Sequence, residues 1–182
     1  MSEATDILTR RFSLAQLLVH ALVIELEAAQ SYKELAKLME QSGNTEVAKL
    51  FAMMSGIEAR HAEIINEQVG DFRLPELTPW QYHWRGLEAP ENIDRTRLHY
   101  LMTPHQAMSL ALENEKRAYE FFADVVDDST DERARELAAE FAGDERQHVA
   151  WVEEWLAKVV LPYDSAHWVQ PPAQLTSGAD AR

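Results

Sequence analysis

The pattern Glu-x-x-His occurs twice in this sequence, at Glu58 and His61 and again at Glu145 and His148. Residues three apart on an α-helix lie on the same face, so each copy directs a carboxylate and an imidazole toward one point. A single pair of this kind is usually solvated and indicates little. Two copies in one chain, each preceded by a further carboxylate at a similar distance, strongly constrain the fold.

The chain repeats itself around these two motifs. Glu25 stands 33 residues before the first motif, and Glu115 stands 30 residues before the second. Each of these glutamates is followed by an alanine three residues later and by an aromatic residue seven residues later. The repeat predicts two copies of a helical hairpin, over residues 13–70 and 103–161.

Apolar residues recur three and four positions apart through all four expected helices, as in amphipathic helices that share a core. Capping patterns mark where these helices begin. We expect capping boxes at Ser13, Thr103 and Ser129, and an N-cap at Thr45. The glutamates and histidines of the repeat fall on the apolar faces, where a charged side chain costs several kcal/mol unless it is paired, protonated or bound to a metal.

Residues 71–102 interrupt the helical pattern. Prolines at positions 75, 79 and 90 break any long helix there, and we expect a crossover with a short helix after Pro90. Such a long connection is unusual in a compact domain, but it allows the third helix to run parallel to the second. The expected fold class is therefore all-α, a ferritin-like four-helix bundle of two hairpins joined by a long crossover.

Length and composition set the outer limits. The 182 residues suit one bundle domain at 13–161, with a lead at 1–12 and a tail at 162–182. A formal charge of −14 disfavours nucleic acid and anionic membranes as partners, and the absence of cysteine excludes thiolate metal sites. No apolar signal segment opens the sequence and no apolar run could span a bilayer, so we expect a cytoplasmic protein.

Six side chains thus face one interior, and oxygen and nitrogen are their ligand atoms. One Glu from each of two helices and Glu-x-x-His from each of the other two is the ligand set of di-iron and di-manganese carboxylate bundles. Four carboxylates and two neutral imidazoles also balance the charge of two divalent cations. Carboxylate-rich ligation favours iron, with manganese as the alternative, over copper or zinc. The predicted metal ligands are Glu25, Glu58, His61, Glu115, Glu145 and His148.

On these motifs, the chain resembles the ferritin-like superfamily, and within it the rubrerythrin-related group, over about residues 10–160. The resemblance implies that Glu25 and Glu115 each bind one iron, that Glu58 and Glu145 bridge both, and that each histidine completes one iron. It also implies a homodimer.

The sequence departs from the family pattern at two alanines. Rubrerythrins carry a further carboxylate one turn after the third-helix glutamate, where this chain has Ala118, and they usually carry a rubredoxin domain, which is absent here. Bacterioferritins place a haem-binding methionine directly after the second-helix glutamate, where this chain has Ala59, so no haem is expected.

Three neighbouring side chains are candidates to support the ligands. Asp144 resembles the aspartate that orients a metal-bound histidine in di-iron bundles. Tyr32, seven residues after Glu25, could donate a hydrogen bond to a ligating carboxylate. For Tyr32 and Tyr119, simple packing as amphipathic aromatic residues is an equally good interpretation.

The expected activity is that of a di-iron oxidoreductase that reduces peroxide or O₂, coupled to oxidation of Fe(II) or of an external electron donor. Because the chain has no cysteine for its own relay, a separate donor protein is implied. Two other classes stay open: an iron storage or ferroxidase protein, and a helical scaffold that binds metal without turnover.

Overall fold

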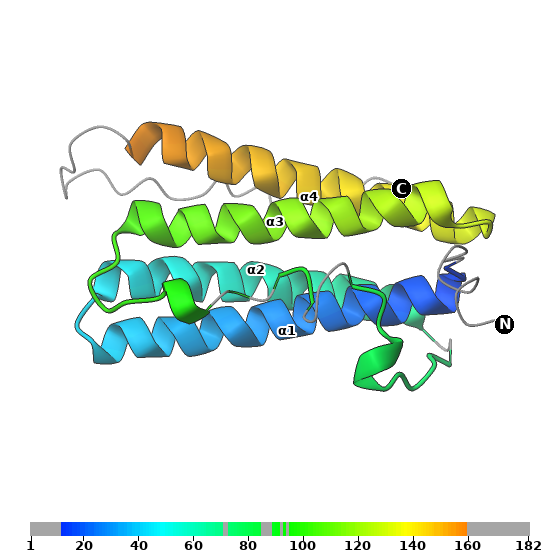
Figure 1. Cartoon of the computed structure of the whole chain (residues 1–182), viewed down its shortest axis with the longest axis horizontal. Helices are drawn as coiled ribbons and strands as arrows, with labels where there is room; N and C mark the ends of the chain where they lie inside the picture. The colour runs from blue at the N-terminus through cyan, green and yellow to red at the C-terminus, as the bar shows by residue number, and fades with distance from the viewer. Residues whose placement is uncertain (1–11, 71–72, 85–88, 92, 94, 160–182) are drawn as a thin grey trace, which may run out of the picture.

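Four long helices form the protein, as a computed structural model shows for residues 12–70, 73–84, 89–91, 93 and 95–159 (Figure 1). The helices are α1 (Leu14–Gln41), α2 (Thr45–Val69), α3 (Pro104–Asp128) and α4 (Glu132–Val159). The ferritin-like four-helix bundle predicted from the sequence is confirmed. The predicted tail and all but the last residue of the predicted lead lie outside the described residues.

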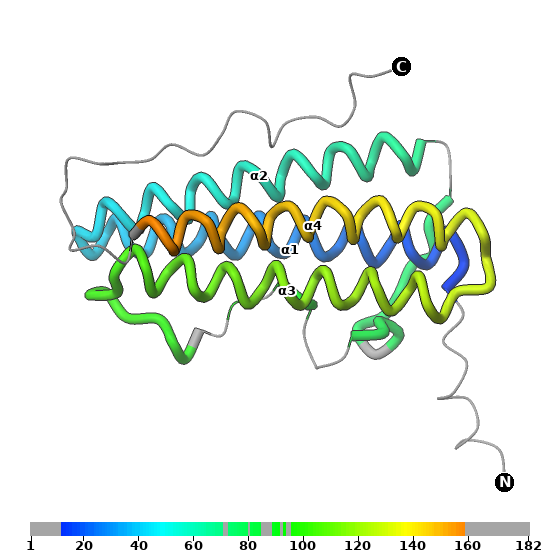
Figure 2. The backbone as a smooth tube through the Cα atoms, turned by 90° about the horizontal axis from the view of Figure 1, so that it is seen from above, coloured from blue at the N-terminus to red at the C-terminus, as the bar shows by residue number. Residues whose placement is uncertain are grey.

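The helices are paired as two hairpins. α1 packs along α2 and α3 packs along α4, while the hairpins meet mainly through α2 with α3 and α1 with α4. Gly43, at a φ of 77°, permits the tight turn between the first two helices. The crossover then returns along the bundle, so that α3 begins at the end where α2 began and runs parallel to it (Figures 1 and 2). No helix in the described ranges has both the length and the apolar content of a bilayer-spanning segment.

The capping predictions hold for α1 and α3 and fail for α2 and α4. Ser13 and Thr103 form the expected capping boxes with Gln16 and Gln106. Asn44, not Thr45, caps α2 by accepting a hydrogen bond from the N–H of Val47 at 3.3 Å. These corrections are local, because each helix still begins within a few residues of its predicted start.

The cap of α4 is Asp131 instead of Ser129. Asp131 Oδ1 accepts from the N–H of Ala134 at 3.2 Å, and its Oδ2 accepts from the N–H of Leu14, the first residue of α1, at 3.0 Å. The Ser129 hydroxyl donates to the carbonyl of Phe12 at 2.6 Å. The side chains around the start of α4 therefore also hold the start of α1.

The crossover lies along the side of the bundle formed by α1 and α3 (Figure 2). The backbone N–H of His83 donates to Nε2 of His20 on α1 at 3.1 Å, and Arg117 of α3 donates to the carbonyl of Pro90 at 2.6 Å. The short helix expected after Pro90 is present as the 3₁₀ helix η3 (Arg95–Arg97), and a second 3₁₀ helix, η2 (Pro79–Gln81), precedes it. Hydrogen bonds between the crossover backbone and the side chains of His20 and Arg117 thus attach this connection to both hairpins.

The core consists of two apolar clusters, one toward each end of the bundle. One includes Met54 and Met108, and the other includes Phe122 and Ile65. On each helix, the inward glutamate lies between residues of one cluster and residues of the other. The predicted ligands therefore form a polar layer between the two apolar clusters.

Candidate metal centre

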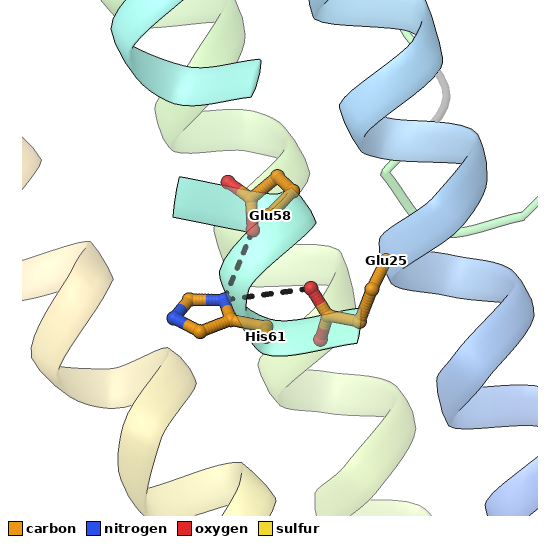
Figure 3. Close-up of side chains that lie close together, drawn as sticks. All are labelled: Glu25, Glu58 and His61. Atoms are coloured by element: carbon orange, nitrogen blue, oxygen red, sulfur yellow. Dashed lines mark hydrogen bonds and ion pairs between the residues drawn. The ribbon is translucent and has the colours of Figure 1, made fainter. Parts of the chain in front are cut away.

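The first half of the polar layer comes from α1 and α2. Glu25 of α1 points toward Glu58 and His61 of α2 (Figure 3). His61 Nδ1 lies 3.2 Å from Glu58 Oε2 and 3.5 Å from Glu25 Oε2. Both glutamates are almost completely buried, at 0% and 2% exposure, because they stand on the apolar faces of their helices.

The second half repeats this arrangement on α3 and α4. His148 Nδ1 lies 3.1 Å from Glu145 Oε2 and 3.3 Å from Glu115 Oε2. In each half, one ligand atom from every residue lies within 4.8 Å of the others, which is the spacing of a group able to hold a metal ion. The two halves meet at the histidines, whose ring centroids are 4.5 Å apart. The structure therefore brings all six predicted ligands together; their binding of metal stays a prediction.

Several buried oxygens of this layer have no hydrogen-bond partner among the described residues. They are Glu25 Oε2, Glu58 Oε1 and both side-chain oxygens of Glu115. A buried acceptor without a partner costs about 1–3 kcal/mol, and more when it is charged, so such atoms require an explanation. Unsatisfied carboxylate oxygens facing imidazole Nδ1 atoms fit divalent cations, which would be bound by the carboxylate oxygens and by Nδ1 of each histidine.

Three glutamates of the layer, Glu25, Glu115 and Glu145, have raised pKa values when no metal is bound. Burial raises the pKa of Glu25 to about 7, although the neighbouring His61 imidazole, 3.5 Å away, opposes the shift. Burial, followed by the negative charge of Glu58, raises the pKa of Glu115 to about 8. Burial also raises the pKa of Glu145. Carboxylates crowded into a dry interior thus keep protons that they would lose in water.

The pKa values of the two histidines are also raised, but by neighbouring carboxylates and against the effect of burial. Burial alone would lower the pKa of His61, but the carboxylates of Glu25 and Glu58 outweigh it and raise the pKa to about 10. The pKa of His148 is raised well above its ordinary value in the same way, by Glu115 and Glu145 against the effect of burial. Protons therefore occupy, in the metal-free protein, the positions between carboxylate and imidazole that metal ions would take.

A small cavity reaches this layer from the side of α2 and α4. Its volume is about 30 Å³, and Glu25, His61 and Glu145 form its inner wall. Ile64, Ile65, Phe141 and Asp144 complete the lining. A cavity of this size holds one or two water molecules, so only very small molecules can reach the polar layer by this route.

The three side chains predicted to support the ligands, Tyr32, Asp144 and Tyr119, differ in burial and in contacts. Tyr32 is fully buried, and its hydroxyl accepts from Asn114 Nδ2 at 3.4 Å. Burial, followed by the charges of Glu115, Glu58 and Glu91, raises its pKa well above the ordinary value, which places it beside the carboxylates. Asp144 is exposed and accepts from Gln147 Nε2 at 3.4 Å, but it lines the cavity together with His61.

The expectation for Tyr119 is not supported, because its side chain is 37% exposed. Ala118 and Phe122, three and seven residues after Glu115, are fully buried, whereas Tyr119, four residues after it, is not. Phe122 is accordingly the counterpart of Tyr32. Tyr119 lies on the outer surface of the bundle.

Glu91 is a further buried carboxylate, and it was not among the residues predicted from the sequence. This crossover residue is only 1% exposed, and both of its carboxylate oxygens lack a hydrogen-bond partner in the described part of the chain. Burial raises its pKa well above the ordinary value, and the charges of Glu58, Glu145, Glu25 and Glu115 raise it further. Glu91 is thus a fifth buried carboxylate near the polar layer, in a segment that has no helical pattern.

Comparison with known proteins agrees with this geometry. The family model described as Rubrerythrin matches residues 16–156. The chain belongs to the rubrerythrin family. The match includes every one of the six predicted ligands and the whole crossover between the hairpins.

One solved structure similar to this rubrerythrin-family protein is that of an uncharacterized conserved protein from Magnetospirillum magnetotacticum MS-1. The two chains are 34% identical, with a TM-score of 0.65, and the match covers 84% of this chain and 99% of the other. Residue identity at this level over nearly the whole neighbour supports a shared fold, consistent with the family assignment.

A curated relative shares a shorter stretch. The magnesium-protoporphyrin IX monomethyl ester oxidative cyclase 1, a chloroplastic protein of Chlamydomonas reinhardtii, is 41% identical over 66 residues. This stretch is 36% of the present chain and only 16% of the cyclase. The similarity is thus confined to a small part of the larger protein.

Proposed function

We propose that this protein is a di-iron carboxylate oxidoreductase that reduces peroxide or O₂. The observation that carries the proposal is the pair of Glu, Glu and His groups, buried face to face with unpartnered carboxylate oxygens. Four carboxylates and two imidazoles suit two divalent cations. Because carboxylate oxygens are hard ligands, they favour iron, with manganese as the alternative. The rubrerythrin family model and the oxidative cyclase among the relatives support metal-dependent redox chemistry.

When bound, two iron ions would supply two electrons together, which is what the reaction H₂O₂ + 2 H⁺ + 2 e⁻ → 2 H₂O requires. The chain itself would bind the ions through Glu25, Glu58, His61, Glu115, Glu145 and His148. The apolar clusters on either side of the polar layer exclude bulk water. The cavity between α2 and α4, of about 30 Å³, suits a molecule the size of peroxide or O₂.

The electrons must come from outside this chain. It has no cysteine, so it carries no thiolate-bound iron or iron–sulfur relay of its own. A separate donor protein, or Fe(II) itself, would fill this role. A homodimer in the cytoplasm is part of the same proposal.

Metal binding and turnover can be tested separately. The protein is loaded with Fe(II) without oxygen, its metal content is measured, and peroxide or O₂ is then added while consumption is followed. We expect two irons per chain and consumption of at least one oxidant. Glu58→Ala and Glu145→Ala should lower both readings, whereas the exposed neighbours Glu63→Ala and Glu140→Ala should lower neither. Loss of neither metal nor activity in the first two variants would overturn the proposal.

An iron storage or ferroxidase protein is the second candidate, favoured by the same ligand set and by the exposed acidic Asp144 at the cavity. Size-exclusion chromatography distinguishes the two, because storage requires a shell of many subunits. A dimer that consumes oxidant repeatedly when a reductant is supplied supports the enzyme. A large assembly that takes up iron in excess of two per chain supports storage.

A further inference from the structure

Glu91 is a buried acidic residue that the predicted ligand set does not include. Its side chain is 1% exposed, and neither carboxylate oxygen has a hydrogen-bond partner among the described residues. It belongs to the crossover, whose other described acidic residue, Glu76, is exposed. A buried carboxylate without a partner is strongly unfavourable, so an evolved protein retains one only where it has a use.

The segment that carries Glu91 is held firmly against α3. Asn114 Nδ2 donates to the backbone carbonyl of Glu91 at 2.8 Å, and Arg117 Nε donates to the carbonyl of Pro90 at 2.6 Å. Arg117 also donates to Asn114 Oδ1, which links the two anchors. Ala89, Pro90 and Ile93 beside Glu91 are buried as well. The backbone is thus fixed so that the Glu91 side chain is kept inside the bundle.

The surroundings of Glu91 identify where its side chain lies. After burial itself, the pKa of Glu91 is raised most by the charges of four predicted ligands, one from each helix: Glu58, Glu145, Glu25 and Glu115. The crossover packs against α1 and α3, whereas both histidines and most of the cavity wall come from α2 and α4. Asn114, next to Glu115, donates both to the Glu91 carbonyl and to the Tyr32 hydroxyl, so Glu91 lies beside the polar layer on the side that the histidines leave free. In the metal-free protein it belongs to neither of the two ligand groups.

We propose that Glu91 is a fifth carboxylate ligand of the metal centre, contributed by the crossover from the side of α1 and α3. This inference rests on the proposed function, because it requires that metal be bound. Position 118, one turn after Glu115 on the inward face of α3, holds a fully buried alanine. The crossover thus supplies a carboxylate where α3 does not.

A fifth carboxylate changes the charge of the centre. Four carboxylates neutralise two divalent ions, but they leave two positive charges when both ions become trivalent. Ionised Glu91 removes one of these charges, so it stabilises the oxidised metals relative to the reduced ones. We therefore expect Glu91 to lower the reduction potential of the centre as well as to tighten metal binding.

The test compares Glu91→Gln with Glu76→Gln, a matched substitution at the exposed crossover glutamate. Each protein is titrated with Fe(II) without oxygen and with Mn(II), and the Co(II)-loaded form is followed by visible absorption, which depends on the coordination number. We expect Glu91→Gln to weaken binding of at least one ion by about 10- to 100-fold, the range seen when groups that support metal ligands are removed. The Co(II) spectrum and the reduction potential should also change, while Glu76→Gln matches the wild type.

A second variant, Glu91→Leu, serves as the control for effects on folding. Glu91→Leu removes the buried polar group entirely, so the metal-free protein should unfold at the same or a higher temperature while metal binding is still weakened. Wild-type protein that binds two ions, together with Glu91 variants of unchanged affinity, Co(II) spectrum and potential, would overturn the role of Glu91 alone. Wild-type protein that binds no metal would instead overturn the proposed function.

Discussion

The imidazole rings of His61 and His148 stack face to face across the bundle, with centroids 4.5 Å apart and planes inclined by 8°. Each ring directs Nδ1 toward the two glutamates of its own hairpin, at 3.1 to 3.5 Å. The two hairpins therefore present equivalent groups to a common centre, as the internal repeat of the sequence predicts. Two adjacent protonated rings would repel each other, but four carboxylates surround them and offset the repulsion.

Because the two hairpins present equivalent ligands, we expect the same substitution in either hairpin to cause a similar loss of metal. We expect Glu58→Gln and Glu145→Gln to lower metal content from two ions per chain toward one, with affinity reduced by about 10-fold or more, because each removes the central carboxylate of one group. Metal analysis after gel filtration measures the content. Glu63→Gln and Glu140→Gln, on the exposed faces of the same helices, are the controls. A variant that keeps both ions while its counterpart loses them would show that only one hairpin determines binding.

The stability of the metal-free protein should fall as pH rises. The folded-state pKa values of Glu25, Glu115, Glu145, His61 and His148 are all raised, to about 7, 8 and 10 for Glu25, Glu115 and His61. Between about pH 4.5 and 10 these groups therefore bind more protons in the folded chain than in the unfolded chain. For each extra proton, the free energy of unfolding falls by up to about 1.4 kcal/mol for every unit by which the pH rises. Urea unfolding of chelated protein at pH 6 and pH 8 measures this slope.

Metal binding must then displace these protons. Calorimetric titration with Mn(II) in buffers of different ionisation enthalpy should show proton release, and affinity should rise with pH. A binding enthalpy that is the same in every buffer would mean that the layer is already deprotonated and that the cause given for the stability slope is wrong.

Much of this centre could be predicted from the sequence because its information is local. Glu58 and His61 share one helical face, and their position on an apolar stripe is visible from the spacing of neighbours such as Met54 and Ile65. The repeat adds Glu25 and Glu115 in the same way. Helical periodicity therefore specified which side chains face inward before any tertiary contact was known.

Glu91 could not be found by that reasoning. The crossover has no period from which an inward direction can be inferred, and the placement of Glu91 depends on contacts of Asn114 and Arg117 with the backbone. The sequence itself shows only a charged residue directly after Pro90 and two positions before Ile93, and the burial of these neighbours is known from the structure alone. Tyr119 is 37% exposed because it stands four residues after Glu115, whereas the fully buried positions Ala118 and Phe122 stand three and seven residues after it.

Asp131 should contribute to stability through two helices at once, since its carboxylate accepts from the N–H groups of Ala134 and Leu14. Loss of an N-cap costs about 1 kcal/mol, and loss of a second bond adds about 1 kcal/mol. We expect Asp131→Ala to lower the free energy of unfolding by about 2 kcal/mol and Asp131→Asn, which retains one acceptor, by less. Urea denaturation of both variants gives the order; equal stability of all three proteins would contradict the link between α1 and α4.

His20 should make the protein sensitive to mild acid. It is fully buried; its Nδ1 lies 2.7 Å from the carbonyl of Gln16, and its Nε2 accepts from the N–H of His83 at 3.1 Å. The ring is therefore neutral, with the proton on Nδ1. Burial lowers its pKa from 6.5 to about 4, with the bond to Gln16 opposing and His83 assisting the shift.

The sign of the His20 effect is opposite to that of the metal ligands. Between pH 6.5 and about 4 the unfolded chain binds the proton and the folded chain does not, so stability falls as pH falls, by roughly 3 kcal/mol in total. Replacement by Gln, which keeps a donor and an acceptor, should remove this part of the pH dependence. Because the ligand cluster changes stability in the other direction, the informative quantity is the difference between His20→Gln and the exposed control His105→Gln, measured in chelated protein at pH 7 and pH 5. Parallel curves for the two variants would show that His20 takes up its proton in the folded state as readily as in the unfolded one, and that its two hydrogen bonds do not fix the neutral ring.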